Sequence, residues 1–337
     1  MPPGSGSTRP GVRLHRRLTP GRLRLHNVHV HSRLLYLLLI LLAPCPAFAE
    51  GKILVSAPSK SLTWFPAALA KERGFYRDEG LDVDFVVMNP RLALQAVISG
   101  DAAYTTALGS TIRAAVRGVP LRVVLTICEK PHFALIAKRG IASIEQLKGK
   151  IVGISSFGAS SDTMARAALL KYKLSPEKDV KILAVGGGLN RLAALKSGAI
   201  DATLIEAPYN VMLEQEGYPR LLFVGDVVPS PIAGFGTSLD RVHKHTGEVQ
   251  RMVRAALRAI QFAKTNRRDT VAAIAKWSGM DAKLADGSYD MAAPTWAASG
   301  VPGPETLRAA MEEVQRELKL DRAPDPAQAF DWSFVKP

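Results

Sequence analysis

The chain has 337 residues, of which 47% are hydrophobic and 22% are charged. This length and composition exclude a disordered, collagen-like or disulfide-scaffold protein and predict a globular protein of two domains. The net charge of +14 is uneven, because residues 1–49 hold seven Arg and no acidic residue, which leaves 37 basic and 30 acidic residues. The remaining charges are mixed in sign and no basic run is interleaved with aromatic residues, so the sequence does not predict nucleic-acid binding.

The first 49 residues have the layout of a cleavable export signal. A basic region ends at Arg33, residues 34–42 are apolar but too short to span a bilayer, and Ala47-Phe48-Ala49 fits the small-x-small cleavage rule. We therefore expect a signal peptide over residues 1–49, a mature chain that begins at Glu50 and a periplasmic location.

Two other export signals fit this segment less well. Cys45 loosely matches a lipoprotein signal, but Pro44 is unsuited just before a lipidated cysteine. The pair Arg16-Arg17 lies too far from the apolar run for a twin-arginine signal. The basic region is also unusually long, which suggests that translation begins near Val28.

Strands and helices alternate through the first half of the mature chain. Short β-branched or apolar runs predict strands at residues 52–57, 81–88, 101–105, 121–128 and 133–138, and apolar residues at helical spacing predict helices at residues 64–73, 91–98 and 111–117. This alternation predicts βαβ units and a mostly parallel sheet.

The same pattern begins again after residue 140. It predicts strands at residues 151–154, 180–185, 201–205, 221–225 and 233–238, and helices at residues 143–147, 162–173, 189–196, 208–216, 249–264, 268–277 and 304–318. Residues 96–104 and 194–202 echo each other, since each is a helix end, a Ser-Gly pair and the start of a strand. The echo predicts two similar lobes rather than one long sheet.

The sequence gives little support for catalysis. The mature chain holds one cysteine, Cys128, inside an apolar run, and its three histidines lie in no metal-ligand or triad spacing. Residues 186–188 are glycines but lack the spacing of a dinucleotide-binding loop. We therefore expect no enzyme activity, no cofactor and no metal site.

Four polar loops follow predicted parallel strands, where α/β sheets bind ligands. These loops supply hydroxyl groups, aromatic side chains that could form flat walls, and one carboxylate. Their small residues leave backbone N–H groups accessible at the starts of the following helices. The candidate ligand-binding residues are Ser61, Trp64, Gly109, Ser110, Ser156, Phe157, Gly158, Ser160, Ser161, Glu206 and Tyr209.

Each of these residues also has a purely structural interpretation. Ser160 or Ser161 could serve only as a helix cap. The three aromatic residues could be ordinary core. Glu206 could pair with a nearby arginine or a backbone amide rather than with a ligand, because a carboxylate at the end of an apolar strand needs a partner.

Several segments together resemble the nitrate/sulfonate/taurine-type periplasmic substrate-binding proteins of ABC importers, a family that includes binders of thiamine-pyrimidine precursors. The most specific is AKERGFYRDEGLDV at residues 70–83, and the others are residues 96–104, 143–150, 179–180, 194–202 and 206–209. Their order and spacing match across most of residues 52–240.

The resemblance implies an α/β fold of type II, in which two lobes clamp a ligand between them. It implies a first lobe of residues 50–136 and 233–337 and a second lobe of residues 137–232, with crossings near Ile136 and Ile232. By position, Ser61, Ser110, residues 156–161 and Glu206 would face the cleft. The chain departs from the sulfonate binders at Glu206-Ala207-Pro208, which suits a ligand with an N–H, a cationic or a neutral group.

The sequence thus predicts a solute-binding component of an ABC importer that captures a small polar or anionic organic solute by hinge closure. Its expected partners are the small-molecule ligand and a separate membrane permease, with no nucleic acid, and we expect a monomer. Two alternatives remain. One is a pyrimidine-precursor-synthase-like enzyme, although that activity is associated in the family with a cysteine-rich motif. The other is a ligand-sensing partner of a membrane receptor.

Overall fold

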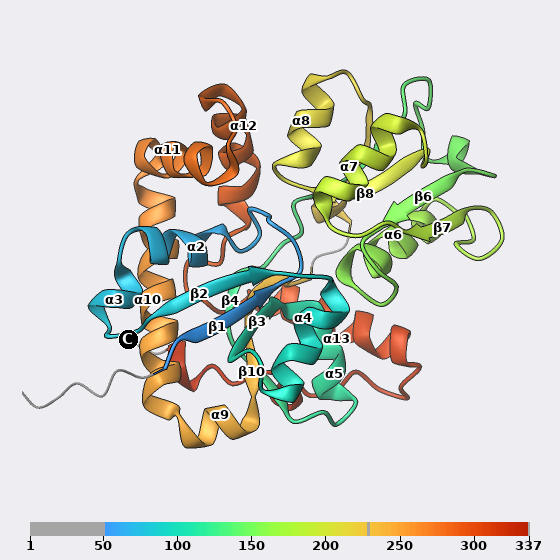
Figure 1. The fold of residues 1–337 in the computed structure, drawn as a ribbon. Helices are drawn as coiled ribbons and strands as arrows, with labels where there is room; N and C mark the ends of the chain where they lie inside the picture. Colours follow the sequence, from blue (N-terminus) through green and yellow to red (C-terminus); the bar gives the residue numbers. More distant parts are fainter. Residues whose placement is uncertain (1–50, 228–229, 336–337) are drawn as a thin grey trace, which may run out of the picture. The chain divides into compact units, whose positions relative to one another are not determined.

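A computed structural model describes residues 51–227 and 230–335 (Figure 1). The predicted signal peptide, its cleavage site and the start of the mature chain lie outside these residues. Among the described residues, no helix is both long enough and apolar enough to cross a membrane.

Sheet 1 has the strand order β2-β1-β3-β10-β4. Strand β1 pairs in parallel with β2 and β3, and β10 runs antiparallel between β3 and β4. The strands are β1 (Ile53–Ala57), β2 (Val83–Val87), β3 (Tyr104–Ala107), β4 (Leu121–Cys128) and β10 (Ala233–Ser238), and the helices between them are α2 (Phe65–Glu72), α3 (Phe75–Asp78), α4 (Pro90–Ser99) and α5 (Leu108–Val116).

Sheet 2 repeats this arrangement with the order β7-β6-β8-β5-β9. Strand β6 is parallel to β7 and β8, and β5 runs antiparallel between β8 and β9. The elements are β5 (Phe133–Ala137), η1 (Glu145–Leu147), β6 (Ile151–Ile154), α6 (Ser160–Lys171), β7 (Lys181–Ala184), α7 (Gly188–Ser197), β8 (Ala202–Glu206), α8 (Tyr209–Gln215), β9 (Arg220–Phe223) and η2 (Val224–Asp226).

The two similar segments, residues 96–104 and 194–202, occupy equivalent places in the two sheets. Helices α4 and α7 both end at a left-handed glycine, Gly100 with φ 87° and Gly198 with φ 81°, and each leads into the third strand of its sheet. Glycine adopts this conformation without the steric cost that a Cβ would add. The prediction of two separate sheets is therefore confirmed.

Helices cover both faces of each sheet. In sheet 1, Val123 of β4 packs with α5 and α13 (Pro304–Leu318), while the next residue, Val124, belongs to the cluster of α2 and α10 (Thr246–Thr265). In sheet 2, the consecutive residues Leu135 and Ile136 of β5 likewise belong to two different hydrophobic clusters. Successive side chains of a strand point to opposite faces, so strands covered on both sides read as continuous apolar runs.

The last third of the chain is mostly helical: α10 packs against α2, α3 and β4 of sheet 1, whereas α12 (Ala282–Ala292) also contacts α8 of sheet 2 (Figure 1). The amphipathic face predicted for residues 249–264 is buried in α10, where Met252, Val253 and Ile260 are inaccessible to solvent. The elements are α9 (Leu239–Lys244), α10 (Thr246–Thr265), α11 (Arg267–Ser278), α12 (Ala282–Ala292), η3 (Ala293–Thr295), α13 (Pro304–Leu318), η4 (Pro326–Gln328) and η5 (Ser333–Val335).

The structure shifts one expected boundary. Strand β5 lies wholly in sheet 2, where Ile136 pairs with Thr203, so the chain passes from sheet 1 to sheet 2 at residues 129–132 rather than near Ile136. It returns to sheet 1 between η2 and β10. The assignment of these parts to two moving lobes stays a prediction. Each sheet is also mixed rather than purely parallel, because β5 and β10 run against their neighbours.

Candidate functional site

The carboxyl ends of β1, β3, β6 and β8 meet around a cavity of about 50 Å³ to which both sheets contribute. More than half of its lining side chains are Ser or Thr. The lining residues are Pro58, Ser59, Ser61, Thr63, Thr106, Ala107, Ser110, Phe133, Ser155, Ala159, Ser160, Ser161, Arg191, Glu206 and Ile232. Parallel α/β sheets place their binding sites at this edge because the loops there converge.

Three hydroxyls in this cavity have no partner. The hydroxyl of Thr106 is buried and unbonded, and those of Ser110 and Ser160 form no hydrogen bond within the described part of the chain. Helices α5 and α6 begin beside them, and neither has a side-chain cap. No side chain therefore satisfies their first backbone N–H groups, and the helix dipoles favour a negative or polar acceptor there.

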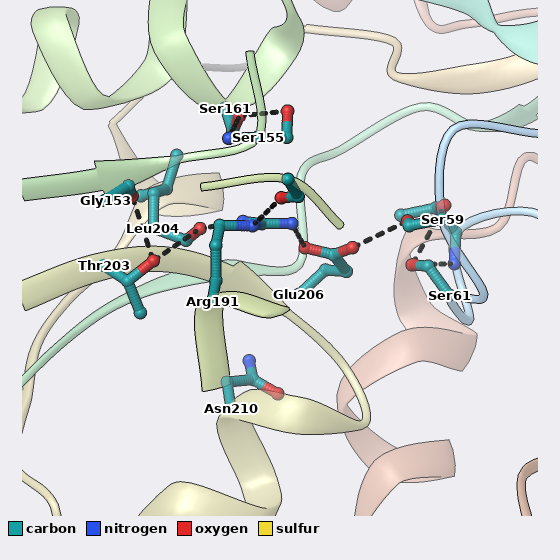
Figure 2. Close-up of polar contacts among 12 residues, drawn as sticks. Ser59, Ser61, Gly153, Ser155, Ser161, Arg191, Thr203, Leu204, Glu206 and Asn210 are labelled. Atoms are coloured by element: carbon teal, nitrogen blue, oxygen red, sulfur yellow. Dashed lines mark hydrogen bonds and ion pairs between the residues drawn. The ribbon is translucent and has the colours of Figure 1, made fainter. Parts of the chain in front are cut away.

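A buried ion pair between Arg191 and Glu206 lines the cavity (Figure 2). Nη2 of Arg191, at the start of α7, lies 2.7 Å from Oε2 of Glu206, at the end of β8, and both side chains are at most 2% exposed. Arg191 also donates to the carbonyl oxygens of Gly186 and Leu204. These bonds compensate the burial of the two charges.

The same carboxylate joins the loops of the two sheets. Ser59, which follows β1 in sheet 1, donates through Oγ to Oε1 of Glu206 in sheet 2, at 2.8 Å (Figure 2). The backbone N–H of Leu62 donates to the carbonyl oxygen of Ala207 at 3.1 Å. Of the interpretations left open for Glu206, pairing with an arginine is therefore present, and its role toward a ligand stays a prediction.

The loop between β6 and α6 is built around Ser161. Its Oγ accepts the backbone N–H of Ser155 at 2.9 Å and lies 2.7 Å from Oγ of Ser155 (Figure 2). The N-cap position of α6 is Ala159, so neither Ser160 nor Ser161 caps the helix. Capping alone is therefore the wrong explanation for these serines: Ser161 holds the loop, and Ser160 faces the cavity.

The structure brings five of the predicted residues together at the cavity, namely Ser61, Ser110, Ser160, Ser161 and Glu206. It places the others elsewhere. Ser156, Phe157 and Gly158 line an adjoining hollow on the other side of Ser110. Tyr209 packs against Gly188 instead of lining the cavity, and burial raises the pKa of its hydroxyl to about 12.

Trp64 belongs to an aromatic cluster in sheet 1. Its ring stacks on Phe85 at a centroid distance of 5.2 Å and meets Trp277 edge-on. Its Nε1 donates to the carbonyl oxygen of Ser59 at 2.7 Å. Trp64 therefore positions the loop that reaches Glu206. Gly109, in the first turn of α5, lies so close to Ser160 that a Cβ there would be 2.7 Å from Oγ of Ser160.

Four residues on which this site depends were not among the candidates from the sequence: Ser59, Thr106, Ser155 and Arg191. Ser59 and Ser155 lie in loops that were predicted, and Thr106 lies at the end of β3, so for these three only the choice of side chain was missed. There was less indication in the sequence that Arg191 belongs to the site. A carboxylate at the end of an apolar strand requires a cation, but nothing in the sequence distinguishes Arg191 from the many basic residues on other helices.

Cys128 and His132 meet Thr295 in a buried cluster beside the passage between the sheets. Oγ1 of Thr295 lies 3.3 Å from Sγ of Cys128 and 3.2 Å from Nδ1 of His132. Burial raises the pKa of the Cys128 thiol to about 12 and lowers the pKa of His132 to about 4. At neutral pH both groups are therefore uncharged, which is the opposite of an activated thiolate–imidazolium pair.

Two five-stranded mixed sheets of equivalent order, each flanked by helices, form the periplasmic-binding-protein fold found in solved structures. The chain belongs to the NMT1/THI5-like family, whose profile matches residues 63–269.

Individual relatives are more distant. The chain is 27% identical over 214 residues to the riboflavin-binding protein RibY of Chloroflexus aurantiacus, an alignment that covers 61% of this chain and 60% of that relative. Among solved structures, it is similar to the alkanesulfonate-binding protein SsuA of Xanthomonas axonopodis pv. citri, with a TM-score of 0.70, 18% identity and coverage of 85% of this chain and 100% of the other. It is also similar to the desulfurization enzyme DSZB, with a TM-score of 0.61, 15% identity and coverage of 85% and 98%. These structures share the fold, and they include both binding proteins and an enzyme.

Proposed function

We propose that this protein is the solute-binding component of an ABC importer and that it captures a small polar or anionic organic solute between two lobes. The observation that carries the proposal is the set of unpartnered hydroxyls, Thr106 and Ser110 from sheet 1 and Ser160 from sheet 2, beside two uncapped helix starts. A solute with acceptor groups satisfies donors that the chain leaves open.

Capture works by closure of the two sheets on the solute. Residues 51–128 and 233–335 form one lobe, and residues 133–227 form the other. The donors come from both lobes, so only the closed arrangement presents them together. A solute that contacts both sides binds the closed state more tightly and thereby shifts the population toward it.

The cavity limits the size of the captured group. Its volume of about 50 Å³ is well below the roughly 300–1,000 Å³ of sites that enclose drug-sized ligands. In the arrangement described here it accepts only a small polar or anionic group, and a larger solute must extend beyond it or hold the lobes further apart.

The proposal also includes export and partners. The leader over residues 1–49 directs the protein to the periplasm, where it acts as a monomer and delivers its solute to a separate membrane permease. An enzyme on the same fold is less well supported by the site, because the buried, uncharged Cys128–His132 cluster offers no activated nucleophile.

A thermal-shift screen tests the proposal with sulfonates, nitrate, aromatic acids, pyrimidines, amines and riboflavin. A ligand at a hundred times its dissociation constant adds about 2.7 kcal/mol to the free energy of unfolding. We expect at least one class to raise the unfolding midpoint and to be recovered chemically unchanged. Recovery of an altered compound would establish the enzyme instead.

The substitution Ser160→Ala tests the site itself, because Ser160 lines the cavity whereas Ser161 holds the loop through its bonds to Ser155. Loss of one hydrogen bond should weaken binding of the screened ligand by roughly 0.5–1.5 kcal/mol, with little change in unfolding. Ser197→Ala, at an exposed serine in the last turn of α7, is the matched control and should leave affinity unchanged. Equal affinity in the Ser160→Ala variant would place the solute elsewhere.

A further inference from the structure

A second hollow of about 210 Å³ adjoins the cavity and shares Ser110 and Ala159 with it. It lies between helices α4 and α5 of sheet 1 and the loop before α6 of sheet 2. Three arginines line it, Arg91, Arg113 and Arg117, and no acidic residue does. The inner cavity, by contrast, has one arginine that is neutralised by Glu206.

Two of these arginines have unused donors. Arg91 and Arg117 are exposed, and their guanidinium groups form no hydrogen bond or ion pair within residues 51–227 and 230–335. Arg113 is largely buried. It donates to the carbonyl oxygen of Gly158 at 3.1 Å, and its Nη1 lies 3.6 Å from Oε2 of Glu317. The hollow therefore carries an excess of positive charge.

A buried hydroxyl also lines this hollow. Ser156 is only 6% exposed, and its Oγ has no hydrogen-bond partner. Burying a hydroxyl without a partner is costly, and such groups in proteins are normally satisfied by water or a ligand. Phe157, which is 46% exposed, supplies an apolar wall beside it.

We propose that this hollow is a subsite for an oxyanion, a phosphate or sulfonate group at the far end of the captured solute. Arg91, Arg113 and Arg117 supply charge and the donor fork that suits such oxygens, and Ser156 supplies a directed hydroxyl. The inference rests on the proposed function, since it makes the solute an extended molecule. Its polar head lies in the inner cavity and its anionic end lies in the hollow.

Calorimetric titration with inorganic phosphate at low salt tests the subsite directly. We expect the wild-type protein to bind phosphate and the double variant Arg91→Gln with Arg117→Gln to bind it at least tenfold more weakly, or about 1.4 kcal/mol. Arg268→Gln with Arg322→Gln, at two exposed arginines that do not line the hollow, removes the same two charges elsewhere and should change nothing. Ser156→Ala, which alters no charge, should weaken binding severalfold.

Glycerol 3-phosphate distinguishes the end of a solute from a free ion. We expect it to bind at least tenfold more tightly than inorganic phosphate, and Ser160→Ala should weaken only the ester. No phosphate binding, or equal binding by the arginine variant, overturns the subsite. Equal affinity for ion and ester overturns its link to the inner cavity. If arginine-dependent phosphate binding persists but no solute in the thermal-shift screen binds, the proposed function fails and the anion site stands.

Discussion

Arg191 and Glu206 depend on each other, because each would be an uncompensated charge in the interior without its partner. Their side chains are 2% and 1% exposed, and Arg191 is held in addition by two carbonyl oxygens. A buried pair of this kind adds little stability compared with apolar residues of the same shape, but removing one partner leaves the other as a buried, unpaired charge.

Arg191→Met should therefore be severely destabilising. It leaves the Glu206 carboxylate buried with only the Ser59 hydroxyl, and we expect the free energy of unfolding to fall by about 3–5 kcal/mol. Urea denaturation measures the loss. The double variant Arg191→Met with Glu206→Gln should recover a large part of it, since no buried charge remains.

The matched control lies on the same helix. Lys196 pairs with Glu216 at 2.7 Å, but both side chains are about 40% exposed, so Lys196→Met should cost less than about 1 kcal/mol. Similar losses at the two positions would mean that the pair at Arg191 is reached by solvent.

At the scale of elements, the first turns of α5 and α6 approach each other closely at Gly109 and Ser160. A Cβ on Gly109 would lie 2.7 Å from Oγ of Ser160 and 3.3 Å from Arg113. The backbone of Gly109 is not in the left-handed region, so alanine introduces no strain of its own. The clash arises between α5 and α6 and not inside either helix.

Gly109→Ala should consequently separate folding from binding. Alanine favours the helix, so stability should be unchanged or slightly raised, while displacement of the Ser160 hydroxyl should weaken solute binding by about 0.5–1.5 kcal/mol. Unfolding curves and calorimetry on the same samples check the two effects. Gly247→Ala, in the first turn of α10 with open space around it, is the control. A loss of stability with unchanged affinity at Gly109 would contradict the interpretation.

The sequence predicted elements better where they repeat than where they differ. The alternation of strands and helices and the echo of Gly100 and Gly198 gave two sheets with the correct order of elements. The sequence could not show that β5 and β10 run antiparallel to their neighbours, because the direction of a strand in a sheet is set by its tertiary pairing. Helix α12 was missed since Asp286-Gly287 reads as a turn, although the Asp281 cap and the buried Leu284 and Tyr289 hold it as a helix.

For the site, the sequence indicated the loops but not the direction of their side chains. Ser160 and Phe157 are three residues apart in one loop, yet one faces the inner cavity and the other the arginine-lined hollow. The turn at Gly158, with φ 77°, separates them. Such a division depends on backbone conformation and on the opposite sheet, and neither can be read from local residue pattern.

At the scale of the whole described chain, several contacts join the two sheets without a solute. They are Ser59 Oγ to Glu206, Leu62 N–H to Ala207, Arg113 to Gly158 and Asn210 Nδ2 to Met291 Sδ. Under the proposed mechanism of closure, these bonds favour the closed state, so the loss of any one of them should shift the population toward the open state.

Ser59→Ala should shift the solute-free protein toward the open state. It removes one hydrogen bond between the sheets, worth about 0.5–1.5 kcal/mol, but leaves Glu206 paired with Arg191. A shift of that size changes the ratio of closed to open molecules by roughly twofold to twelvefold. Small-angle X-ray scattering should show a larger radius of gyration without ligand and recovery of the wild-type value at saturating ligand.

Ser61→Ala is the control for this prediction, because it lies two residues further along the same loop. The Ser61 hydroxyl accepts hydrogen bonds only from Thr63, at 3.2 Å from the backbone nitrogen and 3.1 Å from Oγ1, so its loss breaks no contact between the sheets. Its solute-free radius of gyration should match the wild type. An equal expansion in both variants would mean that the loop itself, rather than the bond to Glu206, governs opening.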